Sequence, residues 1–202
     1  MPSANTTVRR PRAAAPMPVL ASLPPRDRIL RTAHDLFYRD GIRATGIDRV
    51  IAESGVAKVT FYRQFPSKDD LILAFLDYRH ERWMTWFTDA LARHGGNVAA
   101  IVPALAEWFG SAEYRGCAFL NSVGELGPVL PGVIEITRSH KQDMTDAVAA
   151  LMRASSRRAD VARAIALAID GAIVQSQFLD TPEAALEALT QVLKALKPGL
   201  VV

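Results

Sequence analysis

The chain has 202 residues, half of them apolar, and carries 24 Lys and Arg against 21 Asp and Glu. This apolar content is enough for a packed core, but charges or prolines interrupt every apolar stretch short of the ~18 residues of a membrane span, so we expect no membrane insertion. Cys117 is the only cysteine, which excludes an intrachain disulfide, fits the reducing cytoplasm and favours burial as a small apolar residue over a redox role.

Residues 1–24 predict a disordered basic arm. Arg9, Arg10 and Arg12 precede a short run of Ala, Pro and Leu that superficially resembles a secretory signal. Prolines would interrupt the apolar helix of such a signal, and the arginine pair lacks the apolar residues expected after a twin-arginine motif. We therefore expect no export and a cytoplasmic location.

Charge is distributed unevenly along the chain. Residues 1–70 hold 12 Lys and Arg against 7 Asp and Glu, a net charge of +5, whereas residues 71–202 hold 12 against 14, a net charge of −2. A basic N-terminal third indicates a polyanionic partner at that end. A solvated charged face beside a basic tail would give the same pattern.

Three short helices are predicted in residues 25–70. The first follows Pro24-Pro25, where Ile29, Ala33, Leu36 and Phe37 recur at helical spacing until Asp40-Gly41 ends the run. The second opens at Thr45, which forms a capping box with Asp48, and ends at Gly55. The third covers about 57–65 and ends before a proline. Ser67 and Asp70 form another capping box for a long fourth helix, which a pair of glycines ends at 95–96.

The helical pattern continues to the end of the chain. Further helices are predicted at about 97–109, within 116–127, and over 131–154, 157–178 and from 183 to before Pro198. The sequence contains neither alternating runs of β-branched residues nor Asn-Gly hairpin turns, so no β-strand is predicted. The sequence therefore predicts an all-α fold, with a three-helix domain at 25–70 and a larger helical domain at 71–202.

The second and third helices have the spacing of a helix-turn-helix, whose second helix enters the DNA major groove. At about 100° per residue, Phe61 and Phe65 fall on one side of the third helix. The other side carries Val59, Thr60, Tyr62 and Arg63. A guanidinium can donate two hydrogen bonds to guanine, a methyl group can meet the thymine methyl, and hydroxyls suit phosphates. We therefore expect this face to contact DNA.

Helix starts add candidate phosphate contacts. Lys68 stands at the first turn of the fourth helix, where free backbone N–H groups favour an anion. Thr45 and Arg49 occupy a similar place on the second helix. An ordinary three-helix domain with a solvated basic face stays open as an alternative on spacing alone.

A resemblance to a known family favours DNA binding over an ordinary three-helix domain. The stretch from Arg28 to about Arg79 resembles the N-terminal domain of the TetR-family transcriptional regulators. The residues that carry it are, in order, Ile29-Leu30, Ala33, Leu36-Phe37, Gly41, Thr45, Ile51-Ala52, Gly55-Val56, Thr60, Phe61-Tyr62, Phe65 and Lys68. The resemblance implies DNA contacts at Lys58, Val59, Thr60, Tyr62, Arg63 and Lys68, with Tyr62 and Lys68 on phosphates. Ala57 and Val59 depart from the family's frequent small hydroxyl residue and glycine, so the operator sequence does not transfer.

The same resemblance implies a homodimer whose last two long helices form a four-helix bundle. It also implies that the protein is a repressor, released from palindromic double-stranded operator DNA when a small hydrophobic or aromatic effector enters a C-terminal cavity. Activation instead of repression stays open, because the sign of regulation depends on where the operator lies. An architectural DNA-binding protein without an effector also stays open; it would lack an enclosed pocket and bind with little sequence preference.

Aromatic and sulfur side chains of the C-terminal part are candidates to line an effector cavity. The apolar candidates are Trp83, Trp86, Phe87, Trp108, Phe119, Met144 and Phe178, and the polar ones are Glu125, His140 and Gln175. Core packing of the apolar group, and surface or dimer contacts of the polar group, are the alternatives.

No pattern of residues indicates catalysis. His34, His80, His94 and His140 are scattered without His or Cys partners at metal-binding spacing, so we expect no metal site. Glycine-rich phosphate loops and nucleophile elbows are missing, so we expect no cofactor. A helical-bundle enzyme would need convergent acid–base or metal-binding residues, and we therefore predict that the protein is not an enzyme.

Overall fold

The structure is a computed structural model that describes residues 20–196, and all regular structure in this range is helical. The α-helices are α1 (Pro25–Asp40), α2 (Ile47–Ser54), α3 (Lys58–Gln64), α4 (Lys68–Arg93), α5 (Ile101–Phe109), α6 (Ala118–Leu126), α7 (Pro131–Ala150), α8 (Arg158–Gln175) and α9 (Glu183–Leu196). Two 3-10 helices, η1 (Leu20–Ser22) and η2 (Val98–Ala100), precede α1 and α5. The predicted all-α fold is confirmed.

The start of the chain differs from the expectation of a disordered arm over 1–24. Residues 1–19 of that segment lie outside the described residues. Leu20–Ser22 form a turn of 3-10 helix that leads directly into α1. Ordered structure therefore begins before Pro25.

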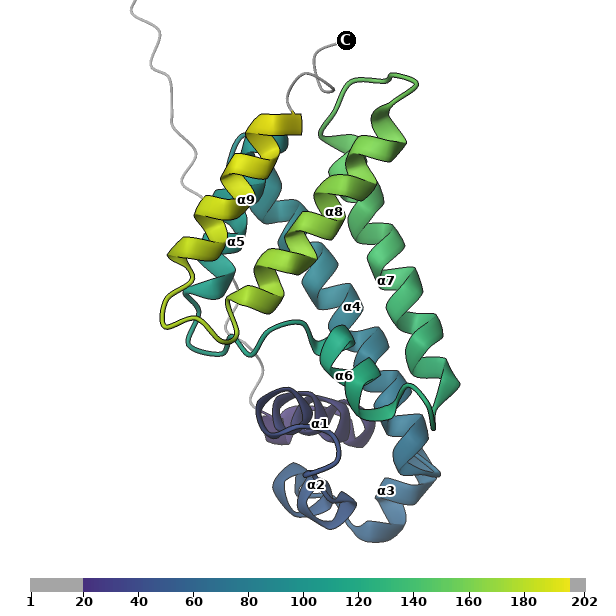
Figure 1. Ribbon diagram of the computed structural model, residues 1–202. Helices are drawn as coiled ribbons and strands as arrows, with labels where there is room; N and C mark the ends of the chain where they lie inside the picture. The colour runs from purple at the N-terminus through teal and green to yellow at the C-terminus, as the bar shows by residue number, and fades with distance from the viewer. Residues whose placement is uncertain (1–19, 197–202) are drawn as a thin grey trace, which may run out of the picture.

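Helices α1, α2 and α3 form a small bundle at one end of the molecule (Figure 1). Phe61 and Phe65 are 0% and 1% exposed, and burial of such a side chain contributes roughly 1.5–3 kcal/mol. Gly55 ends α2 with a φ of 64°, a conformation that favours glycine. The guanidinium of Arg28 on α1 donates to the carbonyl oxygens of Ser54, at 3.0 Å, and Gly55. The helix-turn-helix is therefore tied directly to α1.

Helix α4 joins this small bundle to the larger one formed by α5, α7, α8 and α9 (Figure 1). Ser67 is its N-cap and accepts a hydrogen bond from the backbone N–H of Asp70 at 3.1 Å, as the capping box predicts. Its first half buries Leu71 and Phe75, and its second half buries Trp83 and Phe87. One helix thus carries core residues of both bundles.

Helix α6 lies beside α4, close to the small bundle of α1, α2 and α3 (Figure 1). The carboxylate of Glu125 accepts hydrogen bonds from the backbone N–H groups of Arg43, at 2.8 Å, and Ile42, at 3.4 Å. Nearby, the Tyr38 hydroxyl donates to the carbonyl oxygen of Gly116 at 2.9 Å and accepts from the N–H of Arg115 at 3.1 Å. The α1–α2 connection is therefore held by the α5–α6 region.

Between residues 20 and 196, no helix combines the length and the apolar character that a bilayer span requires.

Candidate functional site

The outer face of α3 is exposed as the sequence predicts. Val59 is 78% exposed and Tyr62 is 41% exposed, while Phe61 and Phe65 are buried. Arg63 is exposed and makes no hydrogen bond or ion pair within residues 20–196. Three kinds of group that are able to contact DNA are therefore exposed on one helix: a branched aliphatic surface, a phenol and a guanidinium.

Two further residues of this face are accessible to different degrees. Thr60 is half-buried, and Lys58 is exposed at the first turn of α3. The Lys58 ammonium lies 3.3 Å from the carboxylate of Asp48, and both side chains are exposed. An exposed ion pair of this kind contributes ~0–1 kcal/mol, so a phosphate can displace the carboxylate.

The expected capping role of Thr45 is wrong. Thr45 is 0% exposed, its hydroxyl donates to the carbonyl oxygen of Gly41 at 2.8 Å, and Gly46 is the N-cap of α2. The side chain packs under α1 because the α1–α2 connection turns it inward. Thr45 therefore has a structural role, and we leave it out of the DNA-binding surface.

Arg49 and Lys68 have partners inside the chain. The guanidinium of Arg49 lies 2.8 Å from the carboxylates of both Asp40 and Glu53. The Lys68 ammonium donates to the carbonyl oxygen of Ile42 at 2.7 Å, and burial lowers the pKa of Lys68. The ammonium keeps two further hydrogens for other acceptors. A phosphate contact by Arg49 has to compete with two carboxylates, whereas one by Lys68 would add to its existing bond.

Six of the ten residues predicted to line an effector cavity come together in the larger bundle. Trp83 lies centrally, with ring centroids 4.6 Å from Phe87, 5.6 Å from Trp108 and 5.1 Å from His140, and Phe119 stacks on His140 at 3.6 Å. Met144 is buried at 1% exposure. The space left among Trp83, Trp108, Phe119 and His140 is only about 10 Å³, at most the room for a single water molecule. Phe87, Phe119, His140 and Met144 are therefore packed in the core, the alternative that the sequence left open, while Trp83 and Trp108 also border an open cleft.

Three of the other four predicted cavity residues lie elsewhere. Glu125 points to the α1–α2 connection, where its carboxylate accepts two backbone hydrogen bonds. Gln175 is exposed at the last position of α8. Phe178, also considered for the cavity, is 70% exposed. None of the three lies with the Trp83 group, although Glu125 lines a separate hollow of about 320 Å³ beside Tyr38 and Ser122, so their assignment to an effector cavity stays a prediction.

His140 is a neutral side chain in this core. Its Nδ1 lies 3.1 Å from Nδ1 of His80, so one ring donates and the other accepts. Burial, with Lys141 and His80 nearby, lowers the pKa of His140 to about 2. Among residues 20–196, no group of three or more His, Cys, Asp and Glu side chains is arranged to hold a metal ion.

An open cleft of about 340 Å³ adjoins this core. Helix α1 contributes one wall residue, α4 contributes four, and α5 with the following loop contributes the rest: Tyr38; Arg79, Arg82, Trp83 and Trp86; Glu107, Trp108, Ser111 and Glu113. Residues of both bundles therefore meet in one small aromatic cleft, which we call the α1/α4/α5 cleft.

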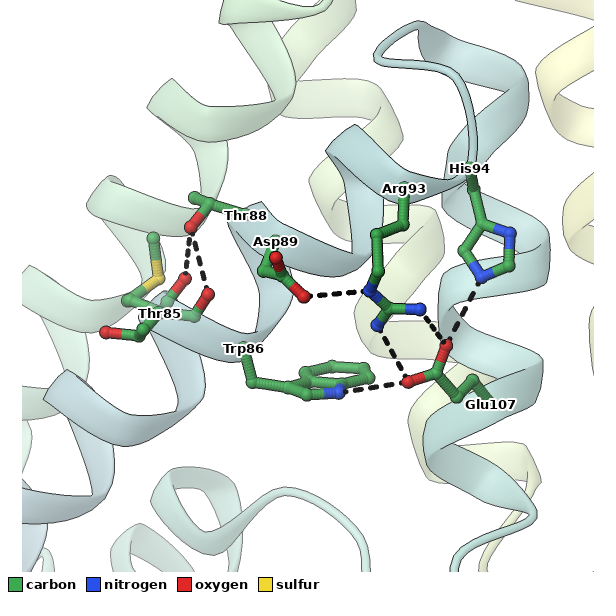
Figure 2. A network of polar contacts seen from close by, with 8 residues as sticks. Thr85, Trp86, Thr88, Asp89, Arg93, His94 and Glu107 are labelled. Atoms are coloured by element: carbon green, nitrogen blue, oxygen red, sulfur yellow. Dashed lines mark hydrogen bonds and ion pairs between the residues drawn. The ribbon is translucent and has the colours of Figure 1, made fainter. Parts of the chain in front are cut away.

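A network of polar contacts fixes Trp86 at the edge of this cleft. Figure 2 shows the Trp86 indole directed at Glu107, whose carboxylate accepts from Trp86 Nε1 at 3.3 Å and from two Arg93 nitrogens at 2.9 and 3.0 Å. His94 approaches the same carboxylate at 3.3 Å. Hydrogen bonding by Arg93, His94 and Trp86 lowers the pKa of Glu107 to about 2. Glu107 therefore stays ionised, and its charge is matched by Arg93.

A larger cavity of about 660 Å³ lies at the opposite end of the molecule. It is lined by the η2–α5 region, the residues after α7 and the end of α9, including Val98, Val102, Met152 and Leu193. None of its lining residues belongs to α1, α2, α3 or α4. A ligand there would touch none of the helices that lead to the candidate DNA-binding surface.

Comparisons with known proteins identify the family of this chain. Residues 29–75 match the TetR_N family, described as bacterial regulatory proteins of the tetR family. The structure of SCO4454, a TetR-family transcriptional regulator from Streptomyces coelicolor, matches with a TM-score of 0.75 and 31% identity over 88% of this chain and 96% of SCO4454. The chain belongs to the TetR family. This is a family of transcriptional regulators and not of enzymes, in agreement with the sequence analysis.

Two further relatives extend the TetR-family comparison. The chain is 26% identical to an uncharacterized HTH-type transcriptional regulator from Lactococcus lactis subsp. lactis, over 50% of this chain and 54% of that relative. The chain thus spans about half the length of this curated relative. The multidrug binding protein EbrR, in complex with malachite green, has the same fold, with a TM-score of 0.62 and 24% identity over 83% of this chain and 96% of EbrR.

Sequence reasoning missed several residues of the α1/α4/α5 cleft. Tyr38, Arg79, Arg82, Glu107, Ser111 and Glu113 were not among its candidates. A signal was present for one of them, because Arg79 is four residues before Trp83 and seven before Trp86, a spacing that places all three on one helix face. Nothing in the sequence indicated that Tyr38, which belongs to the other domain, would line the same cleft.

Proposed function

We propose that this TetR-family protein is a repressor that binds a palindromic operator as a homodimer and leaves it when a small aromatic effector binds. The observation that carries the DNA-binding half is the outer face of α3, where Val59, Tyr62 and Arg63 are exposed and Arg63 has no partner within the described chain. Residues 25–70 serve as the DNA-binding domain, and the remainder from 71 binds the effector and the partner subunit.

An exposed apolar stripe on α8 supports the dimer. Leu167 is 75% exposed and Val174 45%, and with Gly171 they recur at intervals of four and three residues on one side of α8. Phe178, 70% exposed, lies in the turn that follows the end of α8 at Gln175. A Cβ added at Gly171 would meet nothing within 4 Å, so this point of the stripe is open to close approach. Val192 on the neighbouring α9 is 40% exposed. Two copies of α8 and α9 would bury these residues in a four-helix bundle.

The α1/α4/α5 cleft supports regulation by an effector. Its walls include Tyr38 from α1 of the DNA-binding domain, and Trp83 and Trp86 from α4, which is continuous with Lys68 beside the helix-turn-helix. A ligand wedged there would favour one relative position of α1 and α4. The two recognition helices of a dimer fit DNA only when they are ~34–36 Å apart, so a shift between α1 and α4 changes operator affinity.

The first experiment uses the DNA that flanks the coding sequence, because regulators commonly act near their own genes. Footprinting should reveal a protected palindrome, and Arg63→Ala should remove that protection. Arg138→Ala is the matched control, because Arg138 is an exposed arginine on α7 without a partner within residues 20–196. Equal affinity for the flanking DNA and for random DNA would instead support an architectural DNA-binding protein.

A further inference from the structure

We propose that the effector of the α1/α4/α5 cleft is an aromatic carboxylate of one or two rings, whose carboxylate pairs with Arg79. This inference rests on the proposed function, because it names the ligand class for the site already assigned to the effector.

Arg79 is a partly buried cation that lacks an acidic partner. No Asp or Glu forms an ion pair with it anywhere in residues 20–196. Its guanidinium lies 4.0 Å from the centre of the Tyr38 ring, and one nitrogen lies 3.4 Å from Nε2 of His34. Burial lowers the pKa of Arg79, because loss of solvent disfavours the charged form. Buried charges in proteins are normally paired, so this position favours an anion supplied from outside.

The two carboxylates that line the cleft do not fill this role. Glu107 is held by Arg93, His94 and Trp86, as Figure 2 shows. Glu113 is exposed and forms no bond with Arg79. The five donors of a guanidinium match the two oxygens of a carboxylate, and such bidentate pairs are among the strongest hydrogen-bonded contacts.

The other walls of the cleft favour a planar ring. Trp86 and Trp108 have ring centroids 6.0 Å apart, and Trp83 lies 6.2 Å from Trp86 and 5.6 Å from Trp108. The indole N–H of Trp83 is buried without an acceptor, so the core beside the cleft holds one unsatisfied donor. A volume of about 340 Å³ is at the lower end of the ~300–1,000 Å³ found for small-molecule sites. The cleft therefore suits one or two rings.

The test compares carboxylates with their neutral amides. Isothermal titration calorimetry would measure benzoate and 1-naphthoate against benzamide and 1-naphthamide, each at up to millimolar concentration. We expect at least one of the two acids to bind about 10- to 150-fold more tightly than its amide, the effect of hydrogen bonds to a charged group. Arg79→Met should remove this preference and Arg79→Lys should reduce it. The control Arg138→Met lies outside the cleft and should keep it.

Thermal unfolding separates a ligand-binding role from a structural one. Without ligand, Arg79→Met should melt no lower than the unmodified protein, because it removes a buried charge that has no carboxylate partner. The bound acid should raise the melting temperature of the unmodified protein but not of the variant. Amides that bind as well as acids, a preference that survives Arg79→Met, or no binding by any of the four probes would each overturn the proposal.

A measurement of operator release distinguishes failure of the carboxylate proposal from failure of the proposed function. The same four compounds and a panel of neutral aromatic compounds would be added to the complex with the protected flanking DNA. Release by neutral aromatics alone would overturn the carboxylate proposal and leave the proposed function intact. Absence of any sequence-specific DNA binding would overturn the proposed function, whatever the calorimetry shows.

Discussion

Replacing Glu125 by glutamine is expected to loosen the α1–α2 connection of the DNA-binding domain. The carboxylate accepts from the N–H of Arg43 at 2.8 Å and from that of Ile42 at 3.4 Å, so the first bond dominates. Glutamine offers one oxygen and turns an NH2 group toward the second N–H. Loss of a hydrogen bond to a charged group costs about 1.5–3 kcal/mol, or about 10- to 150-fold in a local opening equilibrium.

Amide hydrogen exchange measures this opening directly. The amides of Ile42 and Arg43 should exchange about 10- to 150-fold faster in Glu125→Gln, whereas amides within α8 should keep their rates. Glu135→Gln is the control, because Glu135 is an exposed residue of α7 without a partner in the described part of the chain. Unchanged exchange at Ile42 and Arg43 would refute the assigned role of Glu125.

The remaining predictions concern DNA binding, assembly and pH. Arg63→Ala should lower affinity for the protected DNA by ~1–3 kcal/mol and relax one base position per half-site in binding assays; equal losses on random DNA would argue against base reading. Lys68→Ala should reduce the slope of log K against log salt by ~0.9 per subunit if Lys68 adds a phosphate contact, and an unchanged slope would limit it to its bond with Ile42. Leu167→Glu should convert dimer to monomer in analytical ultracentrifugation, because it places a charge in the apolar stripe of α8; a dimer that persists would place the interface elsewhere. His140 has a pKa of about 2 in the folded chain, so between about pH 6.5 and 2 its imidazole gains a proton only in the unfolded chain. The free energy of unfolding, measured with urea, should therefore fall by about 2 kcal/mol between pH 7 and 5. His140→Phe should flatten this dependence, and an equal fall in the variant would assign it to other groups.

Helix boundaries were predictable because single residues determine them. Gly41 and Gly55 end α1 and α2 with positive φ, and Ser67 caps α4 through its own hydroxyl. Thr45 shows the limit of such local rules. Its spacing to Asp48 fits a capping box, but the chain buries the threonine hydroxyl against Gly41 instead, and that outcome depends on how the connection packs under α1.

The candidate site was predictable on α3 and only partly in the larger domain. The outward face of α3 follows from its helical period and from two phenylalanines that have to be buried. Near Trp83, the sequence left packed core and effector cavity as alternatives, because the distinction depends on the volume filled by side chains from α4, α5, α6 and α7. The unpaired state of Arg79 is also a tertiary property, since it depends on the absence of a nearby carboxylate from any element.

Tyr38 places a constraint on how effector preference can change. Its ring faces Arg79 inside the cleft, while its hydroxyl joins α1 to the backbone at Arg115 and Gly116. In the proposed repressor, a substitution that reshapes this wall would also shift the resting position of the DNA-binding domain, and so alter operator occupancy without any effector. Laboratory selection for a new inducer should therefore accumulate changes at cleft residues that make no contact with α1, such as Ser111, and leave Tyr38 untouched.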